Sequence, residues 1–284
     1  MIVLRELAPA KLNLYLHVTG KRPDGYHLLD SLVVFADIAD KLEVTPADKI
    51  ALSIVGPYAD RIDAKDNSVL KAADVLRTHF KIKTGAALTL HKNLPVGAGL
   101  GGGSADAAAA LKLLARFWKV KPAVQELHKL GLPLGADVPV CLHSTASYVS
   151  GIGEVVEPSP VVTGLYAVLV NTGEPLLTAA VFAQHGEAFS SAMRHPHSFD
   201  SPEACVQFLQ KSKNDLQNTA VKLMPGIKEA LGALGETKEC ALARMSGSGG
   251  TCFGLFTDQK TAQEAAQKLA EVHPEWWVKA ATLR

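Results

Sequence analysis

The first strong pattern along the chain is an alternation of leucines with polar residues near the N-terminus. In the segment Lys11–Leu16 a leucine stands at every second position, which is the two-residue period of a half-buried strand. Because successive side chains of a strand point to opposite faces, Lys11, Asn13 and Tyr15 share one face, away from the leucines. Lys11 and Asn13 are therefore expected to be near neighbours.

A turn is predicted directly after this strand, in the segment Arg22–Gly25. Pro23 restricts φ to the value that a turn needs, and Gly25 can adopt a positive φ. A second strand is therefore expected to start near Tyr26 and to fold back on the first. Tyr26 and His27 would lie beside the turn.

Downstream, the hydrophobic spacing alternates between helix-like and strand-like segments. Asp66, Asn67 and Ser68 precede a period of 3.6 residues that predicts a capped helix ending near Phe80. Alanine and leucine dominate residues 104–118, which predicts a stable helix. The remaining predicted helices are 125–130, 203–211, 216–224 and 262–272, and the remaining predicted strands are 86–94, 166–170, 251–256 and 276–282.

A proline-rich stretch predicts a domain boundary. The residues Glu157-Pro158-Ser159-Pro160 interrupt the periodicity before the strand at 166–170. The length of 284 residues also exceeds the usual size of one domain. We therefore expect an N-terminal domain at 1–155 and a C-terminal domain at 156–284.

The composition is that of an ordinary globular protein, with 48% hydrophobic and 20% charged residues. The formal net charge is +1, and no run of Lys or Arg alternates with aromatic residues. A nucleic-acid-binding surface is therefore not expected, because such surfaces need a basic patch. Small molecules are the expected partners.

The compartment is predicted from what the sequence lacks. The first six residues do not form a basic segment followed by an apolar stretch, and no apolar run approaches the roughly 18 residues of a membrane span. The four cysteines form no Cys-x-x-Cys pair, so neither a zinc site nor a disulfide framework is expected. His195 and His197 have no carboxylate cluster nearby and are interpreted as loop residues. We expect a cytoplasmic protein that does not bind membranes.

The candidate chemistry is concentrated in a glycine-rich loop, Pro95–Ser104, which contains five glycines within seven positions. It lies between a predicted strand and a predicted helix, and Ser104 is a suitable N-cap residue. The first amides of a helix have no intrahelical partners and bind phosphate where side chains do not obstruct them. The loop therefore predicts a phosphate site, although a tight turn would also favour glycine.

Other glycine-loop classes fit less well. Gly97, Gly99 and Gly102 satisfy the dinucleotide-binding spacing, but a helical segment follows where that fold needs a strand ending in an acidic residue. A Walker loop would need Gly-Lys-Ser/Thr at its end. A protein kinase would need His-Arg-Asp and Asp-Phe-Gly motifs, which are absent.

Three segments occur in a fixed order along the chain: Ala8–Asn13, the Pro95–Ser104 loop with Ala105–Ala107, and Met245–Phe253. Together they resemble the GHMP kinases, the superfamily of galactokinase, homoserine kinase and mevalonate kinase. The resemblance implies a two-domain α+β fold with the active site in the cleft between domains, the N-terminal domain binding ATP. Where many members have Ala or Pro after Ser-Gly-Ser-Gly, this chain has Gly250, which predicts a looser backbone.

The resemblance also implies roles for particular residues. Lys11 and Asp137 would be the catalytic pair, with Asp137 as the base that takes a proton from the acceptor alcohol. From the residues alone, an N-cap for 138–142 also fits Asp137, and an exposed strand position also fits Lys11. The residues implied to hold ATP are Pro95, Val96, Gly97, Ala98, Gly99, Leu100, Gly101, Gly102, Gly103, Ser104 and Ala105.

The segments Arg22–His27 and Gly135–Pro139 resemble one branch of this superfamily. Its members phosphorylate the 2-hydroxyl of a cytidine diphosphate-linked methylerythritol, in the non-mevalonate route to isoprenoid precursors. The residues implied to bind this substrate are Asn13, Tyr26, His27, Thr178 and Phe182. Mg²⁺ is implied by the charge of ATP, with Ser104 as a possible ligand.

Three alternatives to this function stay open. They are another small-molecule kinase of the superfamily, a nicotinamide-dependent oxidoreductase, and a nucleotide-binding module without catalysis. The sequence gives no indication of the oligomeric state.

Overall fold

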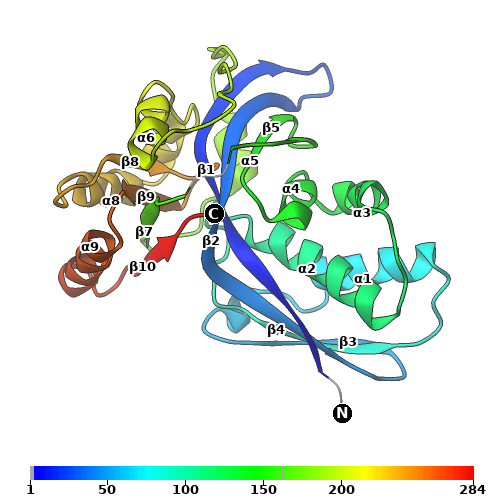
Figure 1. Cartoon of the computed structure of the whole chain (residues 1–284). Helices are drawn as coiled ribbons and strands as arrows, with labels where there is room; N and C mark the ends of the chain where they lie inside the picture. The colour runs from blue at the N-terminus through cyan, green and yellow to red at the C-terminus, as the bar shows by residue number, and fades with distance from the viewer. Residues whose placement is uncertain (1–2, 161–162) are drawn as a thin grey trace. The chain divides into compact units, whose positions relative to one another are not determined.

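The computed structural model describes residues 3–160 and 163–284, and it divides into two compact units (Figure 1). Met1 and Ile2, which belong to the N-terminal segment considered above, lie outside the described residues. The first unit comprises the chain up to Ala10, Ile38–Val96 and Gly101–Ser144. The second unit comprises Lys11–Asp37, Gly97–Leu100 and Thr145–Arg284.

Two long antiparallel strands, β1 (Leu4–Lys21) and β2 (His27–Thr45), open the fold. The predicted turn joins them: Arg22 N donates to Tyr26 O at 2.7 Å, and Gly25 has a φ of +92°. The strands are longer than the sequence pattern predicted. Both faces of β1 are buried from Ala8 to Val18, so the alternation that marks a half-buried strand holds over only part of its length.

In its described residues the first unit combines a small sheet with four α-helices. β3 (Ile50–Val55) pairs in parallel with β4 (Ala86–His91), which pairs antiparallel with residues 41–45 of β2. Figure 1 shows the helices grouped on one side of β3 and β4. The helices are α1 (Ser68–His79), α2 (Gly102–Phe117), α3 (Val124–Gly131) and α4 (Val138–His143).

The predicted cap of α1 is confirmed, since Asn67 Oδ1 accepts a hydrogen bond from Val69 N at 2.9 Å. α1 buries Val69, Ala72, Ala73 and Leu76, and it packs against the buried alanines of α2. Small side chains allow two helix backbones to approach closely. The packing therefore holds α2, and with it the end of the glycine loop, in a fixed place within this unit.

The second unit contains a four-stranded antiparallel sheet in the order β10-β7-β9-β8. Its apolar cluster includes Val168 and Val170 from the sheet and Ile227 and Leu269 from two helices. The strands of the sheet are β7 (Tyr166–Asn171), β8 (Leu242–Met245), β9 (Thr251–Phe256) and β10 (Trp277–Thr282). The helices are α5 (Thr178–Ala183), α6 (Pro202–Gln210), α7 (Gln217–Leu223), α8 (Gly226–Gly235) and α9 (Gln259–Val272).

The residues predicted to mark a domain boundary lie partly in a strand. β6 (Val155–Pro158) pairs with β5 (Ser147–Gly151), which in turn pairs with residues 29–33 of β2. The boundary at 155/156 stays a prediction. The segments β3, β5, β6, β8, α5 and α8 were not predicted, because each is short or lacks a clear hydrophobic period.

A buried arginine fixes β8 to β1 within the second unit. The Arg244 guanidinium donates to Leu14 O at 2.7 Å, to Leu209 O at 3.0 Å and to Ser212 O at 2.7 Å. Burial lowers the pKa of Arg244 to about 10. Burying a cation is costly unless its N–H groups are hydrogen-bonded. The Arg244 guanidinium meets this condition because carbonyl oxygens accept its hydrogen bonds.

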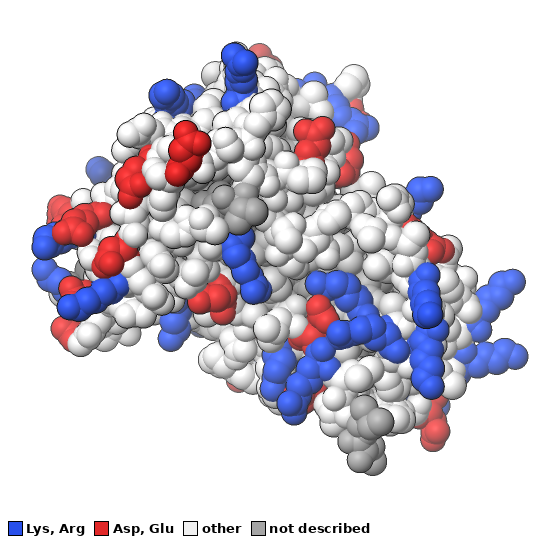
Figure 2. Space-filling view, viewed as in Figure 1, with Lys and Arg blue, Asp and Glu red and all other residues white. Residues whose placement is uncertain are grey.

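On the face drawn in Figure 2, basic and acidic side chains occur side by side. In the first unit, Glu43 pairs with Arg5 and Lys41, and Glu6 pairs with Lys112 and Arg116. Cys205, Cys240 and Cys252 are free thiols. Within the described part of the chain, no helix combines the length and the apolar character that crossing a membrane requires.

Candidate active site

The polar face of β1 is buried and internally hydrogen-bonded. Lys11 is 4% and Asn13 is 5% exposed, so the prediction of a half-buried strand is wrong at these positions. Lys11 Nζ donates to Asn13 Oδ1 at 2.7 Å, and Asn13 Nδ2 donates to Ser31 Oγ at 2.8 Å. Ser31 donates in turn to the carbonyl of Tyr15. The Asn13 side chain therefore accepts a hydrogen bond from the Lys11 ammonium with its oxygen and donates one to Ser31 with its nitrogen.

The same strand contacts the middle of the glycine loop. Lys11 N donates to Leu100 O at 2.9 Å, and Asn13 N donates to Ser246 Oγ at 3.1 Å. Ser246 Oγ donates to Gly99 O at 3.0 Å. One serine hydroxyl therefore connects the first and second sequence motifs to the third, and all of these contacting residues lie within the second unit.

The third motif is packed tightly against the loop. Thr251 N donates to Ala98 O at 2.9 Å, and a Cβ added at Gly250 would lie 3.0 Å from the Cα of Ala98. The looser backbone expected at Gly250 is therefore not what the structure shows. Gly250 has a φ of +92°, a conformation in which a side chain would be strained, so glycine suits this close approach.

The helix after the loop begins earlier than predicted. α2 starts at Gly102, and its N-cap is Gly101, with a φ of +64°, so the prediction of Ser104 as N-cap is wrong. Ser104 lies instead within the first turn. The glycine at position 101 adopts the left-handed conformation that turns the chain into the helix, and the first turn presents backbone amides without bulky side chains. This arrangement suits an anion.

Asp137 lies in the first unit, at the N-cap position of α4. The prediction that Asp137 is the N-cap of α4 is therefore confirmed for its position. Its side chain, however, makes no capping hydrogen bond. The preceding Gly135 runs close to α2, because a Cβ there would lie 3.2 Å from Ser104 Oγ. The structure thus brings the Gly135–Pro139 motif against the first turn of the helix that follows the glycine loop.

The residues predicted to bind substrate lie in the second unit. His27 and Phe182 contact each other, and Asn13 and Thr178 contact serines of the third motif. The rings of His27 and Phe182 are 5.2 Å apart, and the rings of His27 and His185 are 5.9 Å apart. Burial, together with the nearby Lys21 and His185, lowers the pKa of His27, which favours the neutral form of the ring. Thr178 Oγ1 lies 2.8 Å from Ser248 Oγ, and Tyr26 is 59% exposed.

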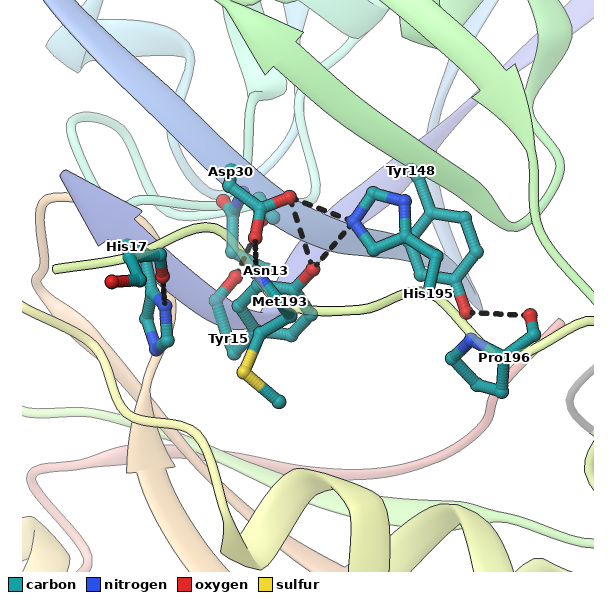
Figure 3. Close-up of polar contacts among 10 residues, drawn as sticks. Asn13, Tyr15, His17, Asp30, Tyr148, Met193, His195 and Pro196 are labelled. Carbon is teal, nitrogen blue, oxygen red and sulfur yellow. Dashed lines mark hydrogen bonds and ion pairs between the residues drawn. The ribbon is translucent and has the colours of Figure 1, made fainter. Parts of the chain in front are cut away.

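A second polar cluster, which the sequence did not indicate, fixes the loop around residues 190–197 (Figure 3). Asp30 accepts hydrogen bonds from Met193 N at 2.6 Å and from Tyr15 at 3.2 Å, and His195 Nε2 lies 2.8 Å from its carboxylate. His195 also stacks on Tyr148 at 3.8 Å. Burial and the negative charge of Asp30 raise the pKa of Tyr15. His195 is therefore a loop residue that pairs with Asp30.

The dinucleotide alternative does not fit this arrangement. α2 is followed by α3, and β4 pairs in parallel only with the preceding β3 among the described strands. The dinucleotide fold needs a strand parallel to the first directly after the helix.

Comparison with known proteins agrees with the motifs. The model of the GHMP kinases N terminal domain matches residues 67–145, and that of the GHMP kinases C terminal domain matches residues 188–275. The chain belongs to the GHMP kinases. It is accordingly a kinase, an ATP-dependent phosphotransferase with ATP as its co-substrate.

The chain is similar in sequence to known kinases over nearly its whole length. A 4-diphosphocytidyl-2-C-methyl-D-erythritol kinase of Paramagnetospirillum magneticum is 48% identical over 97% of both chains. A protein of the same name from Chelativorans sp. is 44% identical over 98% of this chain and 95% of its own. A solved structure, 4-(cytidine 5'-diphospho)-2C-methyl-D-erythritol kinase, is 32% identical, with a TM-score of 0.80 over 99% of each chain.

Proposed function

We propose that this kinase transfers the γ-phosphate of ATP to the 2-hydroxyl of 4-diphosphocytidyl-2-C-methyl-D-erythritol. The product would serve the non-mevalonate, or methylerythritol phosphate, pathway of isoprenoid precursor biosynthesis. The observation that carries the proposal is the nearly full-length similarity to kinases of that name. The junction of Lys11, Asn13, Gly99 and Ser246 supports it, because it joins the three motifs of the family around one serine.

The glycine loop and the start of α2 are proposed to hold the phosphates. Phosphoryl transfer passes through a loose transition state, so the protein contributes mainly by positioning the reactants and stabilising charge. The free amides of the first turn of α2 would stabilise negative charge on phosphate oxygens. The residues proposed for this contact are Pro95 to Ala105, as the sequence predicts.

Asp137 and Lys11 are proposed to act on the acceptor alcohol. The Asp137 carboxylate would accept the proton of the 2-hydroxyl as the oxygen forms its bond to the γ-phosphorus. The bond between that phosphorus and the ADP oxygen breaks, and its electron pair leaves with ADP. Lys11, oriented by Asn13, would stabilise negative charge as it develops on oxygen.

The pair of rings at His27 and Phe182 is proposed to receive the cytosine. An aromatic face stacks on a base, and ring nitrogens provide hydrogen bonds that a base edge can match. A ring separation of 5.2 Å is that of a contact pair, so the cytosine would stack on one side of this pair, with Tyr26 as the exposed partner. Thr178 and Asn13 would contact the rest of the substrate.

Mg²⁺ is proposed to arrive with ATP. Among residues 3–160 and 163–284, no group of three or more His, Cys, Asp or Glu side chains could hold a metal ion, so the phosphates would be its main ligands, with Ser104 as a candidate. We further propose that the enzyme works in the cytoplasm, a reducing compartment that the free thiols of Cys205, Cys240 and Cys252 suit.

The substrate assignment is tested by following ADP release from ATP and Mg²⁺ with a panel of acceptors. We expect turnover with diphosphocytidyl methylerythritol and none with homoserine, mevalonate or galactose. Turnover with only one of the latter three would contradict the substrate and favour another member of the superfamily. Binding of ATP with no turnover of any alcohol would leave a binding module, and binding of NAD in preference to ATP would favour an oxidoreductase.

Replacing Phe182 by Ala is expected to raise the KM for the cytidine substrate by about 2- to 12-fold, since an aromatic pair contributes about 0.5–1.5 kcal/mol. The KM for ATP should stay near the wild-type value, because Phe182 contacts His27 rather than the glycine loop. The matched control is Phe189→Ala, which removes a phenylalanine that is 44% exposed. An equal effect of Phe182→Ala on both KM values would contradict the proposed cytosine contact.

A further inference from the structure

His185 lies just after α5, and none of the roles above uses its side chain. Its backbone amide donates to Phe182 O at 3.3 Å, so His185 and Phe182 belong to one turn of the chain. Both residues lie in the second unit, as does His27. The position of His185 is therefore tied to that of the phenylalanine ring proposed to receive the cytosine.

The ring of His185 contacts the ring of His27 edge to face. The two ring centroids are 5.9 Å apart, and the ring planes are inclined at 76°. The ring of Phe182 lies 5.2 Å from that of His27, at an inclination of 32°. Both separations fall in the range that aromatic pairs prefer. His27 therefore contacts two rings at different angles, and both rings come from the same turn.

The polar edge of the His185 ring does not contribute to stability through a hydrogen bond at Nε2. This atom is buried and has no hydrogen-bond partner in the part of the chain that the structure describes. A buried polar atom without a partner lowers stability, so a histidine in such a place calls for a physical account. The contact with His27 supplies one, because through it His185 acts on a residue of the proposed substrate site.

The orientation of the His27 ring matters for the recognition of a base. A site that hydrogen-bonds a substrate group discriminates strongly against a substrate that lacks the group. An imidazole provides such a hydrogen bond only when one of its nitrogens is directed at the base edge. A ring that is already held in this orientation loses less conformational freedom when the substrate binds, which increases the affinity.

The surroundings of His27 also oppose its protonation. Burial lowers the pKa of His27, and Lys21 and His185 add to this effect. A neutral imidazole keeps one nitrogen that can accept a hydrogen bond, such as one from the exocyclic amine of cytosine, whereas an imidazolium can only donate. A phenylalanine in place of His185 would keep the ring contact but not this electrostatic effect.

We propose that His185 is a positioning residue for cytosine recognition, which holds the ring of His27 in the orientation that binds the base. His185 acts through His27 and does not itself contact the substrate. The inference rests on the proposed function, and in particular on the binding of cytosine at His27 and Phe182. It extends the proposed substrate site by a residue that lies outside the sequence motifs.

The test compares His185→Leu with His185→Phe in steady-state assays at pH 8, where an imidazole of ordinary pKa is neutral. His185→Leu removes the ring contact and should raise the KM for diphosphocytidyl methylerythritol by about 2- to 12-fold, the contribution of an aromatic pair. The kcat and the KM for ATP should stay near the wild-type values. His185→Phe keeps an edge-to-face ring and should recover most of the loss. Its melting temperature should equal or exceed that of the wild type, because a carbon replaces a buried nitrogen without a partner.

A double-mutant cycle shows whether His185 acts through His27. In a His27→Ala background, His185→Leu should have no further effect on the KM for the cytidine substrate, because the ring that it positions is gone. The matched control is His273→Leu, which removes a histidine stacked on Trp276 at 3.7 Å and should leave this KM unchanged. A wild-type KM for His185→Leu, equal losses in His185→Leu and His185→Phe, or losses that add to that of His27→Ala would overturn the inference.

Nuclear Overhauser measurements on the unaltered enzyme keep the test decisive if His185→Leu does not fold. With cytidine 5'-diphosphate bound, the cytosine protons should show contacts to the rings of His27 and Phe182 but not to that of His185, and the contact between the two histidine rings should persist. A contact from cytosine to His185, or loss of the contact between the histidines, would overturn the inference. Absence of turnover of the cytidine substrate by the wild-type enzyme would instead overturn the proposed function, so the two failures are distinguishable.

Discussion

Asp137→Asn is expected to lower kcat by about 10²–10⁴-fold, the usual contribution of a general base, while the affinity for ATP stays near the wild-type value. The amide has the shape of the carboxylate but cannot accept the proton of the 2-hydroxyl. Single-turnover ADP release measures the chemical step, and calorimetry with ATP measures binding. Near-wild-type turnover would remove Asp137 from the role of base.

The same substitution distinguishes the two roles considered for Asp137, general base and N-cap of α4. Asn is as good an N-cap as Asp, so a residue that only capped α4 would tolerate the change. The control is Asp258→Asn at the N-cap of α9, where the side chain does cap, accepting from Thr261 N at 2.7 Å. Asp258→Asn should leave both kcat and the melting temperature almost unchanged. Loss of activity in both variants would point to a general effect on folding instead.

The sequence predicted those parts of the fold that depend on local patterns. Asn67 predicts the start of α1, because its side chain accepts a hydrogen bond from a backbone amide of the first turn. Pro23 and Gly25 predict the turn between β1 and β2. The start of α2 was misplaced for a related reason. Its N-cap, Gly101, has no side chain to signal the start of the helix, whereas Ser104 carries a hydroxyl that suits a cap but lies inside the first turn.

The burial of charged residues could not be predicted, because it depends on strand pairing between distant segments. Asp40 and Lys92 are 52 positions apart and meet because β2 pairs with β4 in the register Lys41 opposite His91. Similarly, Lys11 has the local pattern of an exposed strand lysine, and its burial follows from the contacts of β1 with Leu100 and Ser246. The resemblance to a kinase family selected Lys11 where the pattern alone did not.

Gly99→Ala is expected to abolish measurable ATP binding and turnover. Gly99 has a φ of +70°, and an added Cβ would lie 2.5 Å from Ser246 O and 2.6 Å from Gly249 O. Both neighbours are backbone atoms, so they cannot move aside as a flexible side chain could. The loop must therefore shift away from the third motif, which breaks the hydrogen bond from Ser246 to Gly99 O.

A matched substitution in the same loop isolates the steric part of this effect. Gly97 has a φ of +65°, but an added Cβ would find no atom within 4 Å. Alanine at either position therefore incurs a similar left-handed backbone cost of about 1–2 kcal/mol, and only the substitution at Gly99 adds a collision. Gly97→Ala should weaken ATP binding less than Gly99→Ala does, with a melting temperature lowered by a few degrees, measured by calorimetry and thermal unfolding. If both variants lost ATP binding equally, backbone conformation rather than contact with Ser246 would determine the shape of the loop. If Gly99→Ala bound ATP normally, the close packing of the loop against the third motif would not be needed for ATP binding.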